Sequence, residues 1–259
     1  MKVDPVMRRD AAYFLAGPAL LCLLIAALFH LHPWPVALQA QAENFSWLIT
    51  GWWLAVGVIA IALSSRISCP PAPPLSDGPG WRRVVVWGLG IGLIQGLEGV
   101  AKTATPMFGA RYEALDRAAG FTWGNVGLPW SIPHYFHASV LSECFFRFGV
   151  IVIPVWLLST LLLKGRFQGV LFWTFAALGA LIEPFEQTVL IKHMTFAGMT
   201  AVDIEGSIEG ILWQLIYAWT FRRFGWPAPI LARFGWYLVY RVFAGYFFRP
   251  GSTMYPGPH

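Results

Sequence analysis

Charged residues are scarce in this sequence. They make up 12% of the 259 residues, whereas a soluble globular domain carries about twice that share. Residues of the hydrophobic set account for 57%. A chain this apolar cannot hide its surface in a core alone, so the composition excludes an ordinary soluble protein and indicates one that lipid solvates.

Cysteine is also rare, and Cys22, Cys69 and Cys144 are scattered along the chain. Their odd number and the lack of a CxxC pair exclude a disulfide framework and a thiolate metal site. The chain contains no HExxH, GxSxG or P-loop motif, which excludes the patterns typical of zinc proteases, serine hydrolases and nucleotide-binding proteins. We expect no metal and no cofactor.

Long apolar stretches dominate instead. A transmembrane helix needs about 20 predominantly apolar residues, and seven segments qualify, at 12–31, 46–65, 84–101, 134–163, 167–191, 204–221 and 228–248. The predicted fold is therefore all-α, a polytopic transmembrane bundle of about seven helices in a single domain, 1–259. We divide it into an N-terminal three-helix part with an outer loop (1–133), core helices (134–249) and a tail (250–259).

The basic residues alternate between the connections of these segments. The N-terminus and every second connection hold ten of them: Lys2, Arg8, Arg9, Arg66, Arg82, Arg83, Lys164, Arg166, Arg222 and Arg223. The other connections and the tail hold five: Lys102, Arg111, Arg117, Lys192 and Arg249. Because Lys and Arg favour the cytoplasmic side, we predict a cytoplasmic N-terminus and a multi-pass protein of a bacterial inner (plasma) membrane.

Two segments carry features that should shape their packing. Gly88, Gly90, Gly92 and Gly96 lie in the third segment, and such small residues let a neighbouring backbone approach closely. The fourth segment is too long for one straight crossing, and Pro154 should kink it.

Several ionisable residues fall inside apolar segments, where charge is costly and often functional. Glu143 and Arg147 are four residues apart and can pair along one helix face. Counting about 1.5 Å per residue from each cytoplasmic end places a common set at one height in the outer half of the bundle. This predicted polar layer consists of Glu143, Arg147, Glu183, Glu186, Glu205, Glu209 and Arg241.

The predicted layer contains more carboxylates than guanidiniums. The excess implies that some acids are protonated, hydrated or neutralised by a cation. On the last segment, Arg233, Tyr237 and Arg241 form a stripe at four-residue spacing, and we predict that Arg241 pairs with Glu209. Such a layer either holds the bundle together or lines an outward-facing polar cavity that binds or cleaves a substrate.

Three stretches occur in the order found in one family. Residues 142–149 (SECFFRFG) resemble an EExxxR-G opening motif, 175–179 (FAALG) fall at an FxxxH motif, and 210–233 look like a final helix pair that carries HxxxN. Residues 135–243 thus resemble the CPBP family, the CAAX-processing and bacteriocin-processing (Abi) intramembrane endopeptidases. The resemblance implies peptide-bond hydrolysis within the membrane by a water molecule that a Glu activates, assisted by two His and an Asn.

The sequence differs from the family's motifs at the positions that carry out this hydrolysis. The residues at the Glu, His, His and Asn positions are Ser142, Gly179, Arg233 and Tyr237. Glu143 stands at the second Glu position of the opening motif, and Arg147 stands at the position of its Arg partner. Because arginine stays charged, it cannot shuttle protons. The resemblance therefore implies a divergent, non-catalytic relative that binds a peptide or protein partner in a polar cavity, with Glu143 as the acid of any residual peptidase.

Two other classes of protein fit the same pattern. A cation- or proton-handling transporter would use the acidic layer as its binding site. A structural subunit of a larger membrane complex would use the Gly- and Trp-rich helices for contacts with other subunits. For all three classes the expected partners are the lipid bilayer and a membrane protein or peptide, and not nucleic acid.

Overall fold

The computed structural model describes residues 5–31, 47–67, 69–70, 72–106, 109, 131–185 and 199–244. Every regular element within them is a helix, and no strand occurs among them. The predicted all-α fold class is confirmed. The tail, 250–259, and most of the predicted outer loop lie outside the described residues.

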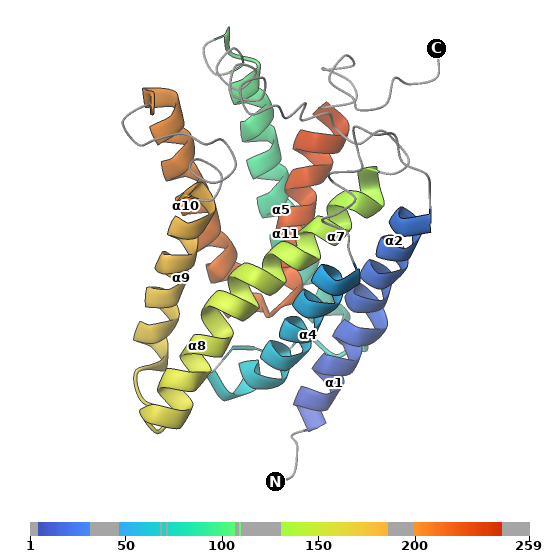
Figure 1. Ribbon diagram of the computed structural model, residues 1–259, viewed down its shortest axis with the longest axis vertical. Coiled ribbons are helices and arrows are strands. Elements are labelled where there is room, and N and C mark those ends of the chain that lie inside the picture. The colour runs from blue at the N-terminus through green and yellow to red at the C-terminus, as the bar shows by residue number, and fades with distance from the viewer. Residues whose placement is uncertain are drawn as a thin grey trace.

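The helices form a bundle (Figure 1). In the labels used here α marks an α-helix and η a 3₁₀- or π-helical segment. In chain order they are α1 (Pro5–Phe14), η1 (Leu15–Ala19), α2 (Leu20–Leu31), α4 (Trp47–Ser64), η3 (Ser65–Ile67), α5 (Gly78–Thr103), α7 (Ser131–Glu143), η4 (Cys144–Val152), α8 (Ile153–Val155), η5 (Trp156–Leu162), α9 (Gln168–Phe185), α10 (Ala201–Phe224), α11 (Pro227–Tyr237) and η8 (Leu238–Phe243).

Four helical runs are long and apolar enough to cross a membrane. They are Arg8–Leu28, Trp47–Ser64, Gly78–Thr103 and Ser131–Leu162. Their outward side chains include Leu48, which is 86% exposed, and Trp52, which is 66% exposed. Large apolar side chains on the outside of so apolar a helix suit lipid rather than water, so the chain is a membrane protein.

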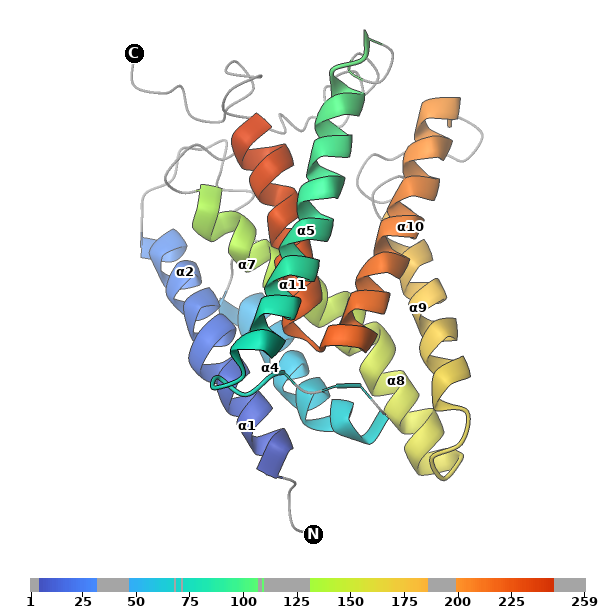
Figure 2. The ribbon, with the colours of Figure 1, turned by 180° about the vertical axis from the view of Figure 1, so that it is seen from behind.

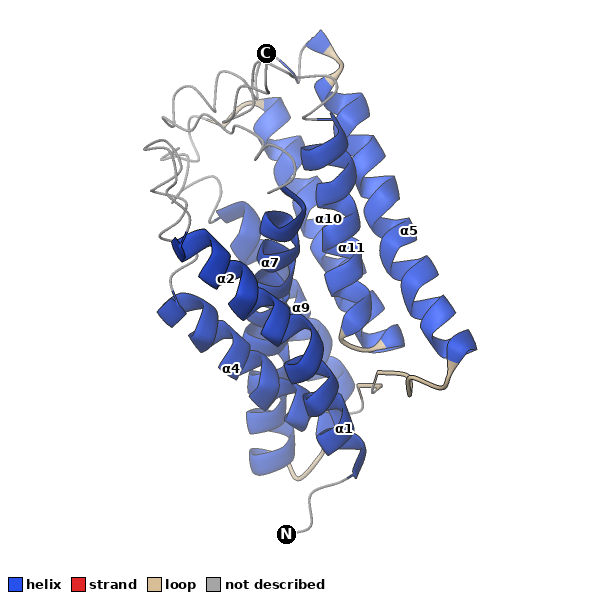
Figure 3. Ribbon diagram, turned by 90° about the vertical axis from the view of Figure 1, so that its right-hand side faces the viewer, coloured by secondary structure: helices blue, strands red, loops and turns tan. Residues whose placement is uncertain are grey.

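An aromatic core joins the first helices to the later ones. Phe14 of α1 packs edge-on against Phe148 of η4 and against Trp226, with ring centroids 6.1 and 5.4 Å apart. Phe148 and Phe172 of α9 both contact Phe221 of α10. All five rings are at most 5% exposed. The early helices α1, α2 and α4 lie on one side of the bundle and α5 on the other (Figure 3). The five rings join α1 to η4, α9 and α10.

The fourth predicted segment is one helical run with π-helical turns. It passes from α7 through η4, α8 and η5 without a break between Ser131 and Leu162. Pro154, the predicted kink, lies in the short α8 with a π-helical segment on each side. A π-helical turn contains an extra residue, so the side chains beyond it are rotated relative to a regular α-helix.

The connection between α10 and α11 lies inside the protein. A capping box begins α10, since the Thr200 hydroxyl accepts from the N–H of Asp203 while the Asp203 carboxylate accepts from the N–H of Thr200. Gly225, at φ 82°, ends the helix, and Pro227 occupies the first position of α11. Trp226 is only 5% exposed, so α11 begins deeper than a helix that follows a surface loop.

A glycine face joins α5 closely to α11 (Figure 2). Gly88, Gly92 and Gly96 are buried, and a Cβ at Gly92 would collide with the carbonyl oxygen of Ala232. A Cβ at Gly90 would meet nothing within 4 Å. The predicted close approach of a neighbouring backbone is confirmed for Gly88, Gly92 and Gly96, and Gly90 does not take part in it.

The loop between α4 and α5 is tied to α1. Arg9 Nη2 donates to the carbonyl oxygen of Ala72 over 2.9 Å, and the Ala72 N–H donates to Asp10 Oδ2 over 2.8 Å. Cys69 in the same loop is 4% exposed, and burial raises the pKa of its thiol to about 12. Because the thiolate is the reactive form, the loop keeps Cys69 unreactive at neutral pH.

Replacing Asp10 with alanine should expose Cys69. The variant leaves the N–H of Ala72 without its buried acceptor, a loss worth about 1–3 kcal/mol, and the loop opens more often. Labelling of Cys69 by a water-soluble maleimide, followed by mass spectrometry, should become about tenfold faster. Cys22 and Cys144, which are buried between helices, serve as internal controls. Equal acceleration at all three cysteines would mean general unfolding instead.

Candidate functional site

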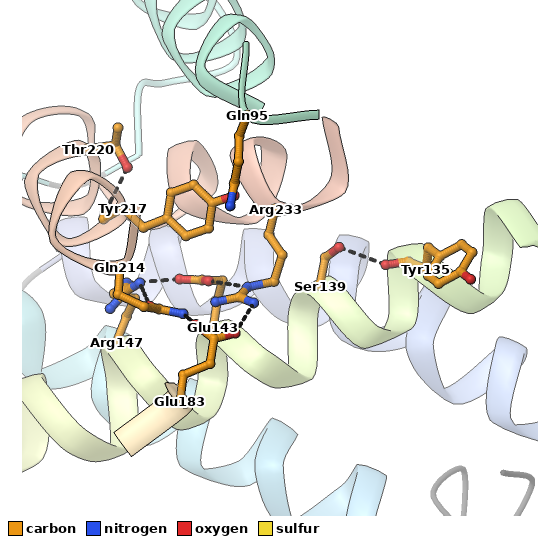
Figure 4. A network of polar contacts seen from close by, with 10 residues as sticks. All are labelled: Gln95, Tyr135, Ser139, Glu143, Arg147, Glu183, Gln214, Tyr217, Thr220 and Arg233. Carbon is orange, nitrogen blue, oxygen red and sulfur yellow. Dashed lines mark hydrogen bonds and ion pairs between the residues drawn. The ribbon is translucent and has the colours of Figure 1, made fainter. Parts of the chain in front are cut away.

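Five polar side chains form a closed ring in the interior (Figure 4). Glu143 contacts two arginines, with Oε2 3.0 Å from Arg147 Nε and Oε1 2.8 Å from Arg233 Nε. Arg233 Nη1 lies 3.1 Å from Glu183 Oε1. Gln214 closes the circle, because its Nε2 donates to Glu183 Oε2 and its Oε1 accepts from Arg147 Nη2. We call these five residues the buried ring.

The buried ring ties together five helical elements of the bundle. Its members come from the end of α7, from η4, from α9, from α10 and from α11. Glu143 and Arg147 are fully buried, and Gln214 and Arg233 are 1% and 3% exposed. The side chain of Glu183 is 19% exposed. Each element that contributes a side chain is therefore held by two polar contacts within the ring.

The ring is balanced in charge. It contains two carboxylates and two guanidiniums, and each of the four carboxylate oxygens has a partner within it. The contact between Arg147 Nε and Glu143 Oε2 is an ion pair that is not aligned as a hydrogen bond. Buried charges repay their desolvation only when they are paired in this way. The ring therefore has no excess negative charge that would require a cation.

Aromatic rings surround the two guanidiniums. The ring of Tyr217 lies 5.9 Å from the guanidinium carbon of Arg147 and 5.3 Å from that of Arg233, and Phe146 lies 5.5 Å from Arg233. These are cation–π distances. The Tyr217 hydroxyl also donates to Gln95 Oε1 of α5. Tyr217 therefore links α5 to the two arginines of the ring.

A second polar group, the outer cluster, lies between α5 and α10. Lys102 Nζ is 2.5 Å from Glu205, 2.6 Å from Glu209 and 3.3 Å from Glu98, and Trp213 Nε1 donates to Glu98 over 3.0 Å. The four charged side chains are 20–43% exposed. Lys102 lies in the last turn of α5, a placement that suits the helix dipole. Glu205 and Glu209 lie beyond the first turn of α10.

The predicted single polar layer is therefore wrong. Five of its seven members divide between the buried ring and the outer cluster, and Arg241 belongs to neither. Arg233, which the depth count left out, belongs to the ring. The count assumed that every segment starts at the membrane surface. Because α11 starts at the buried connection around Trp226, Arg233 reaches the level of Glu143.

Some predicted pairings hold and others do not. The pairing of Glu143 with Arg147 along one helix is confirmed. The predicted pair of Glu209 with Arg241 is wrong, since Glu209 pairs with Lys102. Arg241, in η8, has its guanidinium carbon 5.1 Å from the centroid of its neighbour Tyr240.

Tyr237 borders the buried ring, since its hydroxyl interacts with the guanidinium of Arg233. The ring of Tyr237 stacks on that of Tyr135 with centroids 4.8 Å apart. Glu186 lies outside the described residues. Among the described residues, no group of three or more His, Cys, Asp and Glu side chains could hold a metal ion. Buried His137 is instead 3.1 Å from the hydroxyl of Thr50.

The sequence analysis missed six residues that complete the two groups. They are Gln95, Glu98, Lys102, Trp213, Gln214 and Tyr217. Gln95 and Gln214 each stand alone among apolar neighbours in predicted membrane segments, and a lone amide at such a position needs a hydrogen-bonding partner. That signal could have identified both. Lys102 lies just past the end of a segment and gave no such signal.

Comparisons of the chain were made with protein-family models, curated proteins and solved structures. No family model, no curated protein and no solved structure matches it. The features of the protein that bear on its function are the buried ring, the outer cluster and the surface of the bundle.

Proposed function

We propose that the chain crosses the membrane seven times with its N-terminus in the cytoplasm of a bacterial cell. Besides the four long helices, the shorter apolar helix Gln168–Glu183 and the antiparallel pair α10 and α11 supply the further crossings. The α4–α5, η5–α9 and α10–α11 connections, at or beside which lie seven of the ten basic residues assigned to the cytoplasmic side, lie towards the end where α1 begins (Figure 1). That placement supports the positive-inside orientation.

We propose further that the protein is a non-hydrolytic relative of the CPBP endopeptidases. Three positions of the family's motifs lie close together, which supports the relationship. Arg233, at the position of the third motif, contacts Glu143 of the first. Gly179, at the position of the second, is buried against η4, where a Cβ would lie 3.2 Å from Val150 Cγ1. The helices are thus arranged as a shared site requires, without the side chains of one.

The observation that carries this proposal is the full engagement of Glu143. A general base needs a carboxylate oxygen that can take a proton from water, and both oxygens of Glu143 are held by arginines. No imidazole or free amide stands where the family uses them to stabilise the oxyanion.

A bundle whose buried charges satisfy one another acts through its surface. We therefore propose that the protein binds a membrane protein or a peptide, with the buried ring as the rigid centre that fixes the helices. This version of the hypothesis moves the partner from an internal polar cavity to the outside of the bundle. The role as a structural subunit of a membrane complex is one form of it.

Cation or proton handling is a second candidate, and the outer cluster favours it. Three carboxylates there share one ammonium group, so the cluster has a net negative charge at a half-exposed position. Transport also needs a route across the bilayer. Among the described residues, the carboxylates of the buried ring are paired with guanidiniums, and the aromatic core around Phe148 and Phe221 is apolar. Neither offers a cation an unneutralised carboxylate beyond the outer cluster.

Reconstitution of the full chain in proteoliposomes tests these proposals. A membrane-anchored peptide reporter should be cleaved no faster by the protein than by Glu143→Gln, and vesicles should take up protons no faster than those that contain Glu205→Gln/Glu209→Gln. Gentle detergent extraction should recover the chain with a membrane protein in fixed stoichiometry. Cleavage lost in Glu143→Gln would establish a peptidase, and uptake lost in the double variant would establish a transporter.

A further inference from the structure

Three aromatic rings meet where the first half of α5 passes the end of α10. Trp87 contacts Trp219 with centroids 5.8 Å apart, and it stacks on Phe224 at 5.8 Å with an interplanar angle of 18°. Trp219 and Phe224 are 5.6 Å apart. Trp87 is 48% exposed and Trp219 is 38% exposed. The trio thus presents a large apolar surface outside the bundle.

An arginine flanks this trio on each helix. Arg83 precedes Trp87 by one helical turn, and Arg223 follows Trp219 by one turn, so each arginine shares a helix face with its tryptophan. Both arginines are exposed. Within the part of the chain that the structure describes, neither guanidinium forms an ion pair or a hydrogen bond.

The neighbouring arginines point elsewhere. The guanidinium carbon of Arg222 lies 4.6 Å from the ring centroid of Phe172 on α9, on a different side of α10 from Arg223. Arg82 is exposed too, but it lies about 100° around α5 from Arg83. Helix geometry thus places Arg83 and Arg223 beside the aromatic trio, and Arg82, exposed on another face of α5, offers a control.

The chemistry of this surface matches a phosphate group with an apolar body. Guanidinium groups bind phosphate oxygens through two parallel hydrogen bonds, and exposed tryptophans are typical of the membrane interface. Inorganic phosphate would occupy the arginines and leave the exposed rings uncovered. A phospholipid would place its phosphate between the arginines and its glycerol and acyl chains over the rings.

We propose that Arg83, Arg223 and the rings of Trp87, Trp219 and Phe224 form a binding site for an anionic phospholipid. Two unpaired positive charges select an anionic headgroup over a zwitterionic one, because the zwitterionic headgroup brings its own cation to the site. The site lies on the surface where α5 meets α10, away from the buried ring. It does not depend on whether the protein has a peptidase ancestor or binds a partner protein.

The test uses the purified full chain in neutral detergent with dioctanoyl phosphatidylglycerol as the probe. Binding is followed by calorimetric titration, with dioctanoyl phosphatidylcholine and inorganic phosphate as comparison ligands. The variant Arg83→Gln/Arg223→Gln should bind phosphatidylglycerol about 30-fold more weakly than the unchanged chain, because each arginine that contacts the headgroup contributes several-fold in affinity.

The control variant is Arg82→Gln/Arg166→Gln, which removes the same charge from two other exposed arginines of the basic connections. It should keep the affinity within about twofold of the unchanged chain. Equal weakening by both double variants would overturn the site in favour of general charge attraction. Inorganic phosphate that binds as tightly as phosphatidylglycerol would overturn the lipid assignment. Thermal unfolding of both variants checks that the bundle is intact.

Discussion

Replacing Arg233 with alanine is expected to destabilise the bundle by about 3–5 kcal/mol. The guanidinium of Arg233 holds Glu143 over 2.8 Å and Glu183 over 3.1 Å, and its side chain is 3% exposed. Without it, Glu143 keeps one arginine and Glu183 keeps only Gln214. A buried carboxylate that loses its counter-charge must be hydrated or protonated at the expense of the fold. The measurement is reversible unfolding in mixed micelles.

The control for this variant is Arg82→Ala, which removes an exposed arginine and should change stability by no more than about 0.5 kcal/mol. Arg233→Met combined with Glu183→Gln should recover part of the loss, because the pair disappears without an unpaired charge. If Arg233→Ala and Arg82→Ala prove equally stable, the buried ring does not hold the helices together.

Replacing Gly92 with alanine is expected to destabilise the protein by about 3 kcal/mol. The added methyl group would collide with the carbonyl oxygen of Ala232 and would lie 2.8 Å from the backbone nitrogen of Trp236. Both obstacles are backbone atoms, which cannot rotate away as a side chain can. α5 and α11 would have to separate, and α11 would carry Arg233 away from Glu143.

Gly90→Ala is the matched control, since the same methyl group would meet nothing within 4 Å there. Alanine favours a helix over glycine by about 0.5–1 kcal/mol, so this variant should be slightly more stable than the unchanged chain. The two substitutions, two residues apart on α5, should therefore have opposite signs in the same unfolding experiment. The same sign for both would contradict the close backbone contact.

Features that depend on local spacing could be predicted from the sequence. The apolar lengths of the segments determine the helices that can cross a membrane. The four-residue spacing of Gly88, Gly92 and Gly96 places them on one face of α5, and the same spacing lets Glu143 meet Arg147. Each of these contacts lies within one helix or on one helix face, so no knowledge of the neighbouring helices is required.

Contacts between helices could not be predicted in the same way. The partner of Glu143 on α11 depends on where the connection between α10 and α11 lies. That connection is buried around Trp226, and a residue count that starts every helix at the membrane surface cannot detect this. The π-helical segment η4 follows directly after Glu143, and its extra residue alters which side chains face α9 and α10. Gln214 could have been predicted, because a lone amide in a membrane segment requires hydrogen-bonding partners.

The charge balance of the buried ring depends on the order in which the chain is synthesised. Arg233 belongs to α11, the last α-helix among the described residues. A nascent polypeptide that has delivered only the helices up to α10 therefore holds Glu143 and Glu183 with Arg147 as their one arginine. This intermediate carries a surplus carboxylate until α11 arrives, so the delivery of α11 completes the electroneutrality of the buried ring.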